Sequence, residues 1–591
     1  MALYQLCLFQ NLGYSKILQI GEAQSSPLFK TKCSNYVHRP IQCKASTVSN
    51  QAIPRRYANF GPSVWDYDFI QSLTSEFLDN ELYAQQRNEL KEEVRTMLCK
   101  MKNPLYQLEL IDDLQRLGVA YHFKNEINNI LNNVYKNMDS FVEEKNLYFT
   151  ALKFRLLREN DYLISAEIFG CFQDGKCNFK EWLSTDIKGI LSLYEASFYS
   201  MENEIILDKA RDFSLKNLNE FVKKYKNTDL SFLVGHALEI PLCWRMPRLE
   251  THWFIDFYER KQSVNHSLLK LAKLDFNMVQ AIHQEDLKHA SRWWNKTALG
   301  GKLSFARDKI VENFVWTVAF SFLPHFGHLR RVLTKVNALI TTIDDIYDVY
   351  GTLEELELFS DVVSRWDINA IDTLPEYMKI CFLELYNFVD EFARDILKEK
   401  EHQILPYLTK VWADLCKAYL TEAKWFFGGY APSLEEYIDT AWISIGSTVI
   451  LIHCYFSTPN PIRMEDLKYL EEYSNIIRTS SKISRLVNDL RTQKREMEDG
   501  DVIKSIQCYM HDTGASGQFA REHIKSMICT IWKKMNEDVN YSPFPPSFTE
   551  IALNKVRMSL CMYQYGDAHS IQDTKSTKWK SSLLFDAIPI P

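Results

Sequence analysis

The amino-acid sequence predicts an all-α protein. Glycine and proline are scarce, with 19 and 18 among 591 residues, which is below their average usage. After Arg55 apolar residues recur at helical spacing over most of the chain, and no block of useful length alternates apolar and polar side chains as a strand would. Such a chain is expected to fold into helices joined by short loops.

The helical pattern is clear where leucine and isoleucine recur at every third position: Leu105, Leu108, Ile111, Leu114 and Leu117. Gly118 follows directly and is a typical helix stop. Similar amphipathic stretches continue to about residue 260, and loops are expected at Asp174–Asn178 and Tyr225–Asp229.

The length of 591 residues exceeds what one hydrophobic core usually serves, so two large domains are expected. A boundary is predicted near Lys261–His266, where a polar stretch precedes a helix that starts around Leu268. Residues 1–50 differ from the rest, with five Lys or Arg, one Glu, no Asp and six Ser. A basic, serine-rich, acid-poor leader is typical of an organelle transit peptide, with an ordinary disordered tail as the alternative.

Composition excludes several function classes. The net charge of −7 argues against nucleic acid and against an anionic membrane surface as partners. The longest apolar candidate for a membrane span, Trp442–Phe456, is interrupted by Ser444, Ser447 and His453, so we expect a buried helix there and no membrane span. The thirteen cysteines form no CxxC pair and no zinc-binding spacing, which is typical of free thiols in a reducing compartment.

A cluster of aspartates occurs in the segment Asp344-Asp345-Ile346-Tyr347-Asp348. At about 100° per residue, the preceding helical pattern places four polar residues on one stripe: Asn337, Thr341, Asp344 and Asp348. Two carboxylates four residues apart would then point the same way. Oxygen ligands at this spacing suit Mg²⁺, which completes its shell with water and substrate phosphates. Taken alone, the motif would also fit a solvated acidic helix face.

A second polar ladder lies within residues 488–496 and steps by four: Asn488, Thr492 and Glu496. A carbonyl, a hydroxyl and a carboxylate on one helical face form a suitable site for a hard cation, and Arg485 projects near them. The alternative is a polar helix exterior. It is disfavoured because Ile483 and Leu486, just before the ladder, are expected to be buried.

Basic side chains precede the aspartates, in the segment Phe305-Ala306-Arg307-Asp308-Lys309. Arg307 and Lys309 lie 37 and 35 residues before Asp344. Beside two metal-binding faces, these cations would hold a departing diphosphate. Surface charge is the common alternative for an isolated Arg-x-Lys pair.

Together these features resemble the class I plant terpene synthases. Asp344–Asp348 matches the DDxxD signature of that family, and the ladder from Asn488 matches its (N/D)DxxSxxxE motif with threonine at the serine position. Arg55-Arg56, followed by eight residues and Trp65, matches the RRx8W motif of the monoterpene synthase subfamily. The resemblance covers essentially the whole chain after residue 50.

The resemblance implies an N-terminal helical barrel-like domain over residues 51–262 and a C-terminal class I terpenoid synthase bundle over residues 263–591. Residues 1–50 would be a plastid transit peptide, and the protein would be a plastid monomer or homodimer. The implied reaction is the Mg²⁺-dependent ionisation of geranyl diphosphate to a C10 hydrocarbon or tertiary alcohol. Three Mg²⁺ ions are implied, with Mn²⁺ as a substitute.

The resemblance also assigns roles to residues. Two of the metals would be bound by Asp344 and Asp348, and the third by Asn488, Thr492 and Glu496. The diphosphate would be held by Arg307 and Arg485, and the carbocation would face the rings of Trp316 and Tyr563. Asp567 lies in the family's C-terminal active-site segment, where it would help to order the lid.

Two departures from the family pattern stand out. The usual RxR is Arg307-Asp308-Lys309 here, and Lys309 lacks the bidentate fork of arginine. The N-terminal half has no DxDD motif, so cyclisation initiated by protonation is not expected, and that domain would supply only an Arg55-Arg56 strap over the active site.

Several alternatives stay open. A sesquiterpene synthase acting on farnesyl diphosphate uses the same machinery, and the leader and Arg55-Arg56 argue against it. A prenyl chain-elongating enzyme would carry two DDxxD motifs. An isoprene-releasing enzyme would have Phe seven residues before DDxxD, where this chain has Asn337. A non-catalytic helical prenyl-binding protein would be expected to have a broken metal set.

Overall fold

The structure is a computed structural model that describes residues 55, 58, 60–137, 146–499, 503–564 and 574–590, with the backbone alone described for 493–499, 563, 564 and 574–577. Within these ranges every regular element is a helix, and the single isolated β-bridge joins Gln173 and Phe179. The predicted all-α fold is confirmed.

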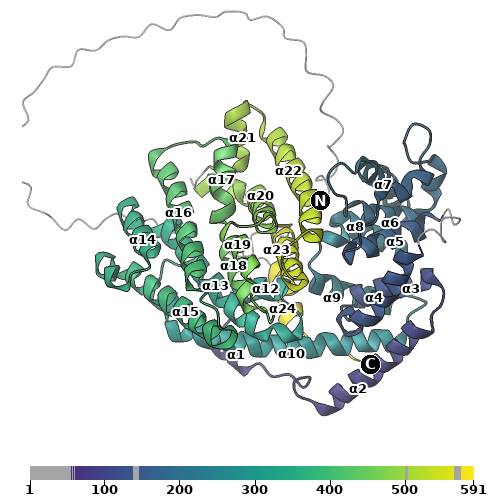
Figure 1. Ribbon diagram of the computed structural model, residues 1–591, viewed down its shortest axis with the longest axis horizontal. Helices are drawn as coiled ribbons and strands as arrows, with labels where there is room; N and C mark the ends of the chain where they lie inside the picture. The colour runs from purple at the N-terminus through teal and green to yellow at the C-terminus, as the bar shows by residue number, and fades with distance from the viewer. Residues whose placement is uncertain are drawn as a thin grey trace, which may run out of the picture.

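The first group of helices is drawn in purple and blue in Figure 1. Its α-helices are α1 Tyr67–Ser72, α2 Glu81–Lys100, α3 Pro104–Arg116, α4 Lys124–Lys136, α5 Leu147–Glu159, α6 Ile187–Ser197, α7 Ile205–Lys224, α8 Asp229–Glu239 and α9 Pro247–Glu259. Both loops predicted in this region are present, because α7 ends before residue 225 and a turn occupies residues 174–177.

Helix α3 shows how local sequence sets an element. Asn103 caps its first turn by accepting hydrogen bonds from two backbone N–H groups, and Pro104 stands at the first helical position. The threefold spacing buries the side chains expected from the sequence: Leu108, Ile111, Leu114 and Leu117. Gly118 adopts φ +75°, and a Cβ there would come within 2.7 Å of the Thr251 hydroxyl, so the helix stops where predicted.

The second group holds the teal, green and yellow helices of Figure 1. Its α-helices are α10 His266–Thr297, α11 Leu299–Lys302, α12 Ile310–Phe320, α13 Gly327–Asp345, α14 Leu353–Arg365, α15 Glu376–Lys400, α16 Leu405–Gly428, α17 Leu434–Ser444, α18 Ser447–Ser457, α19 Met464–Glu471, α20 Asn475–Asp499, α21 Ser505–Thr513, α22 Gly517–Asn540, α23 Pro546–Gln564 and α24 Thr574–Leu584.

Helix α10 joins the two groups. It runs along the lower edge of both in Figure 1 and packs against α1, α2 and α9 as well as α12, α13 and α24. One continuous cluster of buried apolar side chains extends through both groups, from Ile70 to Ile588. The two groups therefore share a core, and the division at residue 262 stays a prediction.

The expected helix over Trp442–Phe456 is wrong in one respect, since the structure breaks it at Gly446 into α17 and α18. Gly446 adopts φ +73°, and a Cβ there would lie 3.0 Å from Ile340 Cγ2 on α13. By length and composition, Leu434–Ser457 could cross a membrane, but 78 % of its most apolar window is buried inside the protein. Core packing accounts for its composition.

Candidate active site

Five helices of the second group close a ring. Helix α12 packs on α13, α13 on α18, α18 on α20, α20 on α23, and α23 returns to α12 (Figure 1). The motifs expected to carry chemistry lie on these helices or in the segment just before α12. The ring therefore brings together segments that are far apart in the sequence.

The aspartate motif spans the end of α13 and a π-helical turn, Ile346–Tyr350. Asp348, the last member of the predicted stripe, therefore lies in a π turn and not in regular α-helix. The Gly351 N–H closes this turn on the Ile346 carbonyl at 2.8 Å, and a Cβ at Gly351 would come 2.9 Å from that same oxygen. Such π turns are rare in proteins overall, and those that occur are often found at functional sites.

Arg307 binds both aspartates at the end of α13. Its guanidinium forms ion pairs with Asp344 and Asp345, the second with 2.8 Å between Nε and Oδ1. Its backbone N–H also donates to Asp345 Oδ2 at 2.7 Å. Burial raises the pKa of Asp345 and the positive charge of Arg307 opposes that rise, which leaves the pKa at about 6.

The second ladder lies on α20. Asn488 and Thr492 are both half-buried, and the Thr492 hydroxyl donates to the Asn488 carbonyl at 3.2 Å. Ile483 and Leu486 are buried as expected. Glu496 lies within α20, and its side chain is outside the described part of the structure.

Arg485, one turn before Asn488, is buried and tightly held. Its Nε donates to Asp489 Oδ1 and to the Tyr437 hydroxyl, both at 2.8 Å. Tyr437, on α17, in turn donates to Asp489 Oδ1 at 3.1 Å. Neither Asp489 nor Tyr437 was singled out from the sequence, although Asp489 directly follows Asn488.

Helix α16 packs against the π turn that carries Asp348 and against α17, which carries Tyr437. Burial raises the pKa of Tyr419 on this helix, and the nearby carboxylates of Asp344 and Asp348 raise it further. Glu422 lies one turn along α16. Besides burial, its negative charge raises the pKa of Tyr419 and that of Tyr437, which contacts Arg485. Helix α16 thus contacts the elements that carry Asp348 and Tyr437.

The remaining predicted residues are placed as follows. Trp316 is buried in α12, which packs against both α13 and α23. Tyr563 lies in α23, with its side chain outside the described part, and Asp567 is outside the described residues. The Lys309 side chain is buried beside the first turn of α12. The ion pairs with Asp344 and Asp345 are formed by Arg307.

The N-terminal segment reaches the aspartate motif. Arg55 forms a bidentate ion pair with Glu355 and donates to the Tyr350 carbonyl at 3.1 Å, at the end of the π turn. Glu355 also completes the capping box at the start of α14. Arg56 is outside the described residues, and Trp65 packs on Phe585 with ring centroids 5.0 Å apart.

Asn337 belongs to a polar seam between α12 and α13. Its side-chain amide donates to the Thr317 hydroxyl at 3.1 Å and to the Asn313 carbonyl at 3.4 Å. The Thr341 hydroxyl donates to the Asn313 side chain at 3.3 Å. Neighbouring hydroxyl and carbonyl groups thus satisfy the Asn337 amide donor.

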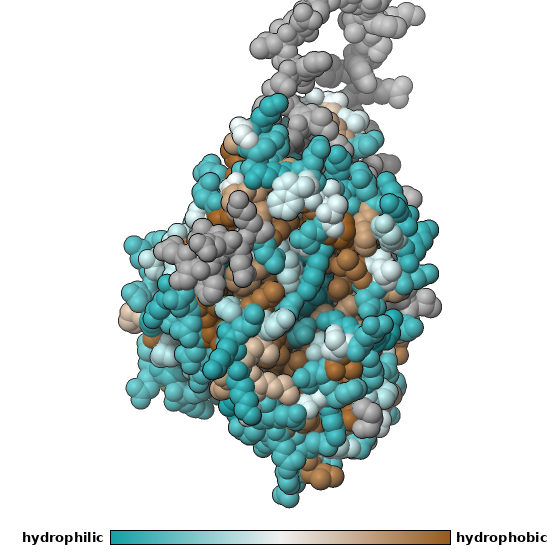
Figure 2. Space-filling view, turned by 90° about the vertical axis from the view of Figure 1, so that its right-hand side faces the viewer, coloured by the Kyte–Doolittle hydropathy of each residue, from teal (hydrophilic) through white to brown (hydrophobic). Residues whose placement is uncertain are grey.

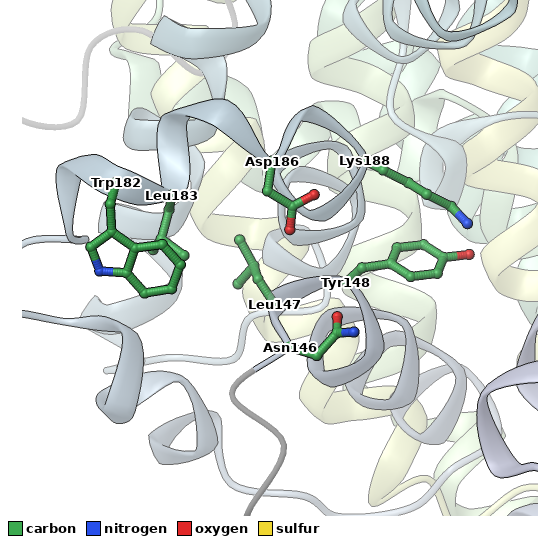
Figure 3. Close-up of a pocket in the computed structure, with 7 residues that line it drawn as sticks. All are labelled: Asn146, Leu147, Tyr148, Trp182, Leu183, Asp186 and Lys188. Atoms are coloured by element: carbon green, nitrogen blue, oxygen red, sulfur yellow. The ribbon is translucent and has the colours of Figure 1, made fainter.

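A separate hollow lies in the first group of helices. It has a volume of about 340 Å³ and is lined by Asn146, Leu147, Tyr148, Trp182, Leu183, Asp186 and Lys188 (Figure 3). The Lys188 ammonium lies 3.8 Å from the centroid of the Tyr148 ring. None of these residues belongs to a motif, and the face in Figure 2 shows apolar side chains scattered among hydrophilic ones, as on an ordinary surface. The candidate active site is therefore the ring.

Known proteins decide the family. The family model "Terpene synthase, N-terminal domain" matches residues 64–238, and "Terpene synthase family, metal binding domain" matches residues 295–534. A myrcene synthase from Quercus ilex, described as chloroplastic, is 56 % identical over 563 residues, covering 94 % of each chain. The chain belongs to the terpene synthase family. As the sequence predicted, it is an enzyme of this family, with a divalent-metal-binding domain.

Solved terpene synthase structures share the fold. A limonene synthase with bound 2-fluorolinalyl diphosphate superposes with a TM-score of 0.88 at 43 % identity, over 91 % of this chain and all of that one. An isoprene synthase from grey poplar, in complex with three Mg²⁺ ions and dimethylallyl-S-thiolodiphosphate, gives 0.83 at 43 % identity, over 89 % and 99 % of the chains. The class I terpenoid synthase fold is thereby confirmed.

Proposed function

We propose that this enzyme is a plastid monoterpene synthase that ionises geranyl diphosphate with three Mg²⁺ ions. The proposal is supported by the ring, whose helices carry the aspartate motif, the polar ladder and Arg485, with Arg307 in the segment just before α12. The 56 % identity to a chloroplastic myrcene synthase supports the C10 substrate and the plastid. The basic leader and Arg55 support the same assignment.

The residues present fit a hard cation. Asp344 lies at the end of α13 and Asp348 follows four residues later in the π turn, and Asn488 and Thr492 lie one turn apart on α20. Among the described side chains, no group of three or more His, Cys, Asp or Glu residues gathers to hold an ion alone. Mg²⁺ needs no such group, since it takes one or two carboxylates and completes its shell with water and substrate phosphates.

Bound Mg²⁺ supplies Lewis acidity that draws charge onto the departing diphosphate. In the proposed reaction the allylic carbon–oxygen bond breaks and diphosphate leaves with the electron pair. Arg307 and Arg485 hold that anion with charge-assisted hydrogen bonds. Trp316 faces the cation left behind, whose charge its ring stabilises without adding a nucleophile. Arg55 draws the N-terminal segment over the site and limits access of water.

Turnover is expected to require a divalent metal. A chelator should abolish product formation from geranyl diphosphate, Mg²⁺ should restore it, and Mn²⁺ should restore part of it. Gas chromatography of products from C5, C10 and C15 diphosphates should give a kcat/KM for the C10 substrate at least about tenfold above the others. Preference for farnesyl diphosphate would assign a sesquiterpene synthase, and metal-independent turnover would refute the mechanism.

Asn337→Ile is expected to lower the ratio of alcohol to hydrocarbon products while ionisation is largely kept. Asn337 lies seven residues before Asp344, about 10 Å along α13 from the metal site. An amide there can hold a water that quenches a tertiary cation, and isoleucine cannot. Thr334→Val is the matched control, because it removes a buried hydroxyl from the same seam one turn further from the metal site. An unchanged ratio, or a wild type that makes only hydrocarbons, would make Asn337 a purely structural residue.

A further inference from the structure

Each metal motif contains an aspartate directly after its first predicted ligand. Asp345 follows Asp344, and Asp489 follows Asn488. Both are almost fully buried, with 1 % and 0 % exposure. Because adjacent residues of a helix point about 100° apart, neither can join the ligand stripe of its motif.

The two buried aspartates have the same kind of partner. Asp345 forms an ion pair with the Arg307 guanidinium, with 2.8 Å between Nε and Oδ1, and accepts the Arg307 backbone N–H at 2.7 Å. Asp489 accepts the Nε–H of Arg485, also at 2.8 Å. In each case the partner is an arginine assigned to the diphosphate. A carboxylate on Nε fixes the plane of the guanidinium and so the direction of its terminal amino groups.

Asp489 ties Arg485 to two further elements. Its Oδ1 accepts the Tyr437 hydroxyl at 3.1 Å, which connects α20 to α17. Its Oδ2 accepts the backbone N–H of Ser505, the first residue of α21, at 3.3 Å. Three elements thus converge on one carboxylate, whereas Asn488 beside it stays half-buried.

We propose that Asp489 is a positioning residue and not a metal ligand: it aims the Arg485 guanidinium at the diphosphate of the substrate and anchors it to α17 and α21. The inference rests on the proposed function, since it presupposes a diphosphate at this site. At the aspartate motif Asp345 contacts Arg307 through an ion pair with its guanidinium and a hydrogen bond from its backbone N–H.

A merely structural role is the competing explanation, because removing one member of a buried ion pair destabilises a protein whatever else the pair does. The chain offers a matched control in Asp466 on α19. This aspartate is also 0 % exposed, accepts the Arg463 Nε–H at 3.0 Å and accepts the Tyr455 hydroxyl at 2.6 Å. Asp466→Asn therefore removes the same kind of contact outside the two metal motifs.

The test is calorimetric binding of inorganic diphosphate to the full chain in saturating Mg²⁺. Asp489→Asn is expected to raise the diphosphate Kd about tenfold or more, with an unchanged Mg²⁺ requirement. Asp466→Asn should lower the Tm to a similar degree and keep the wild-type Kd. Tyr437→Phe removes one of the hydrogen bonds to Asp489 and keeps the ring, so it should give a smaller rise in Kd even where Asp489→Asn folds poorly.

Each contrary result has its own meaning. A wild-type Kd in Asp489→Asn and Tyr437→Phe would overturn the positioning role. Loss of Mg²⁺ affinity in Asp489→Asn would overturn it in favour of a metal ligand. Wild-type protein that binds no diphosphate in Mg²⁺ would refute the proposed function itself, and the inference with it.

Discussion

Asp344→Ala is expected to lower kcat/KM by about three orders of magnitude. The metal ions stabilise charge on the leaving group by several kcal/mol, and each 1.36 kcal/mol is worth a factor of about ten in rate. The Asp344 carboxylate stands at the end of α13 with 31 % of its side chain exposed, paired with Arg307. The substitution removes an anionic ligand and also one carboxylate partner of Arg307.

The rate is measured by product formation from geranyl diphosphate, and the fold by far-ultraviolet circular dichroism. The helical signal should stay intact, because Asp344 lies at a helix end and is not part of the apolar core. Asp372→Ala is the control, since Asp372 is 91 % exposed and pairs with Lys379 at the surface. Near-normal turnover of Asp344→Ala would refute the metal assignment.

Deletion of residues 1–56 is expected to reduce cyclic product more than total ionisation, with kcat/KM falling about tenfold. Arg55 donates hydrogen bonds to the Glu355 carboxylate and to the Tyr350 carbonyl. These contacts hold the N-terminal segment on the π turn that carries Asp348. Phe60, further along that segment, lies with its ring centroid 5.3 Å from the Arg307 guanidinium carbon. Without the Arg55 contact, water gains access to the cation and ends the reaction early.

The comparison is a shortened chain that begins at Arg55, which should remain soluble and active because it keeps every described contact. Glu355→Gln separates the charge effect from the deletion, since the amide oxygen can still accept the Thr352 N–H of the capping box. This variant should change product ratios in the same direction as the deletion. Unchanged ratios in both would eliminate the strap role of Arg55.

Helical spacing made much of the site predictable. The ladder of Asn488 and Thr492 and the buried face of α3 both follow from the fixed geometry of the α-helix, in which residues three or four apart share a side. The same rule does not show where the backbone leaves α geometry. Asp348 lies in a π turn, and Gly446 divides an apolar run into two helices. A spacing rule cannot detect either event, because both depend on neighbours in space.

The helical class and the two polar motifs at Asp344 and Asn488 were predictable from the sequence, because they are local patterns of residue type and spacing, whereas the roles of Arg307 and Arg485 came from the family resemblance. The hydrogen-bond partners of the arginines came from the tertiary structure alone. Arg55 donates to Glu355, 300 residues away, and Arg485 donates to Tyr437, 48 residues away. Such partners are set by the packing of apolar helix faces around the ring, which brings polar side chains of different helices within hydrogen-bonding distance. A one-dimensional pattern carries no information about that packing.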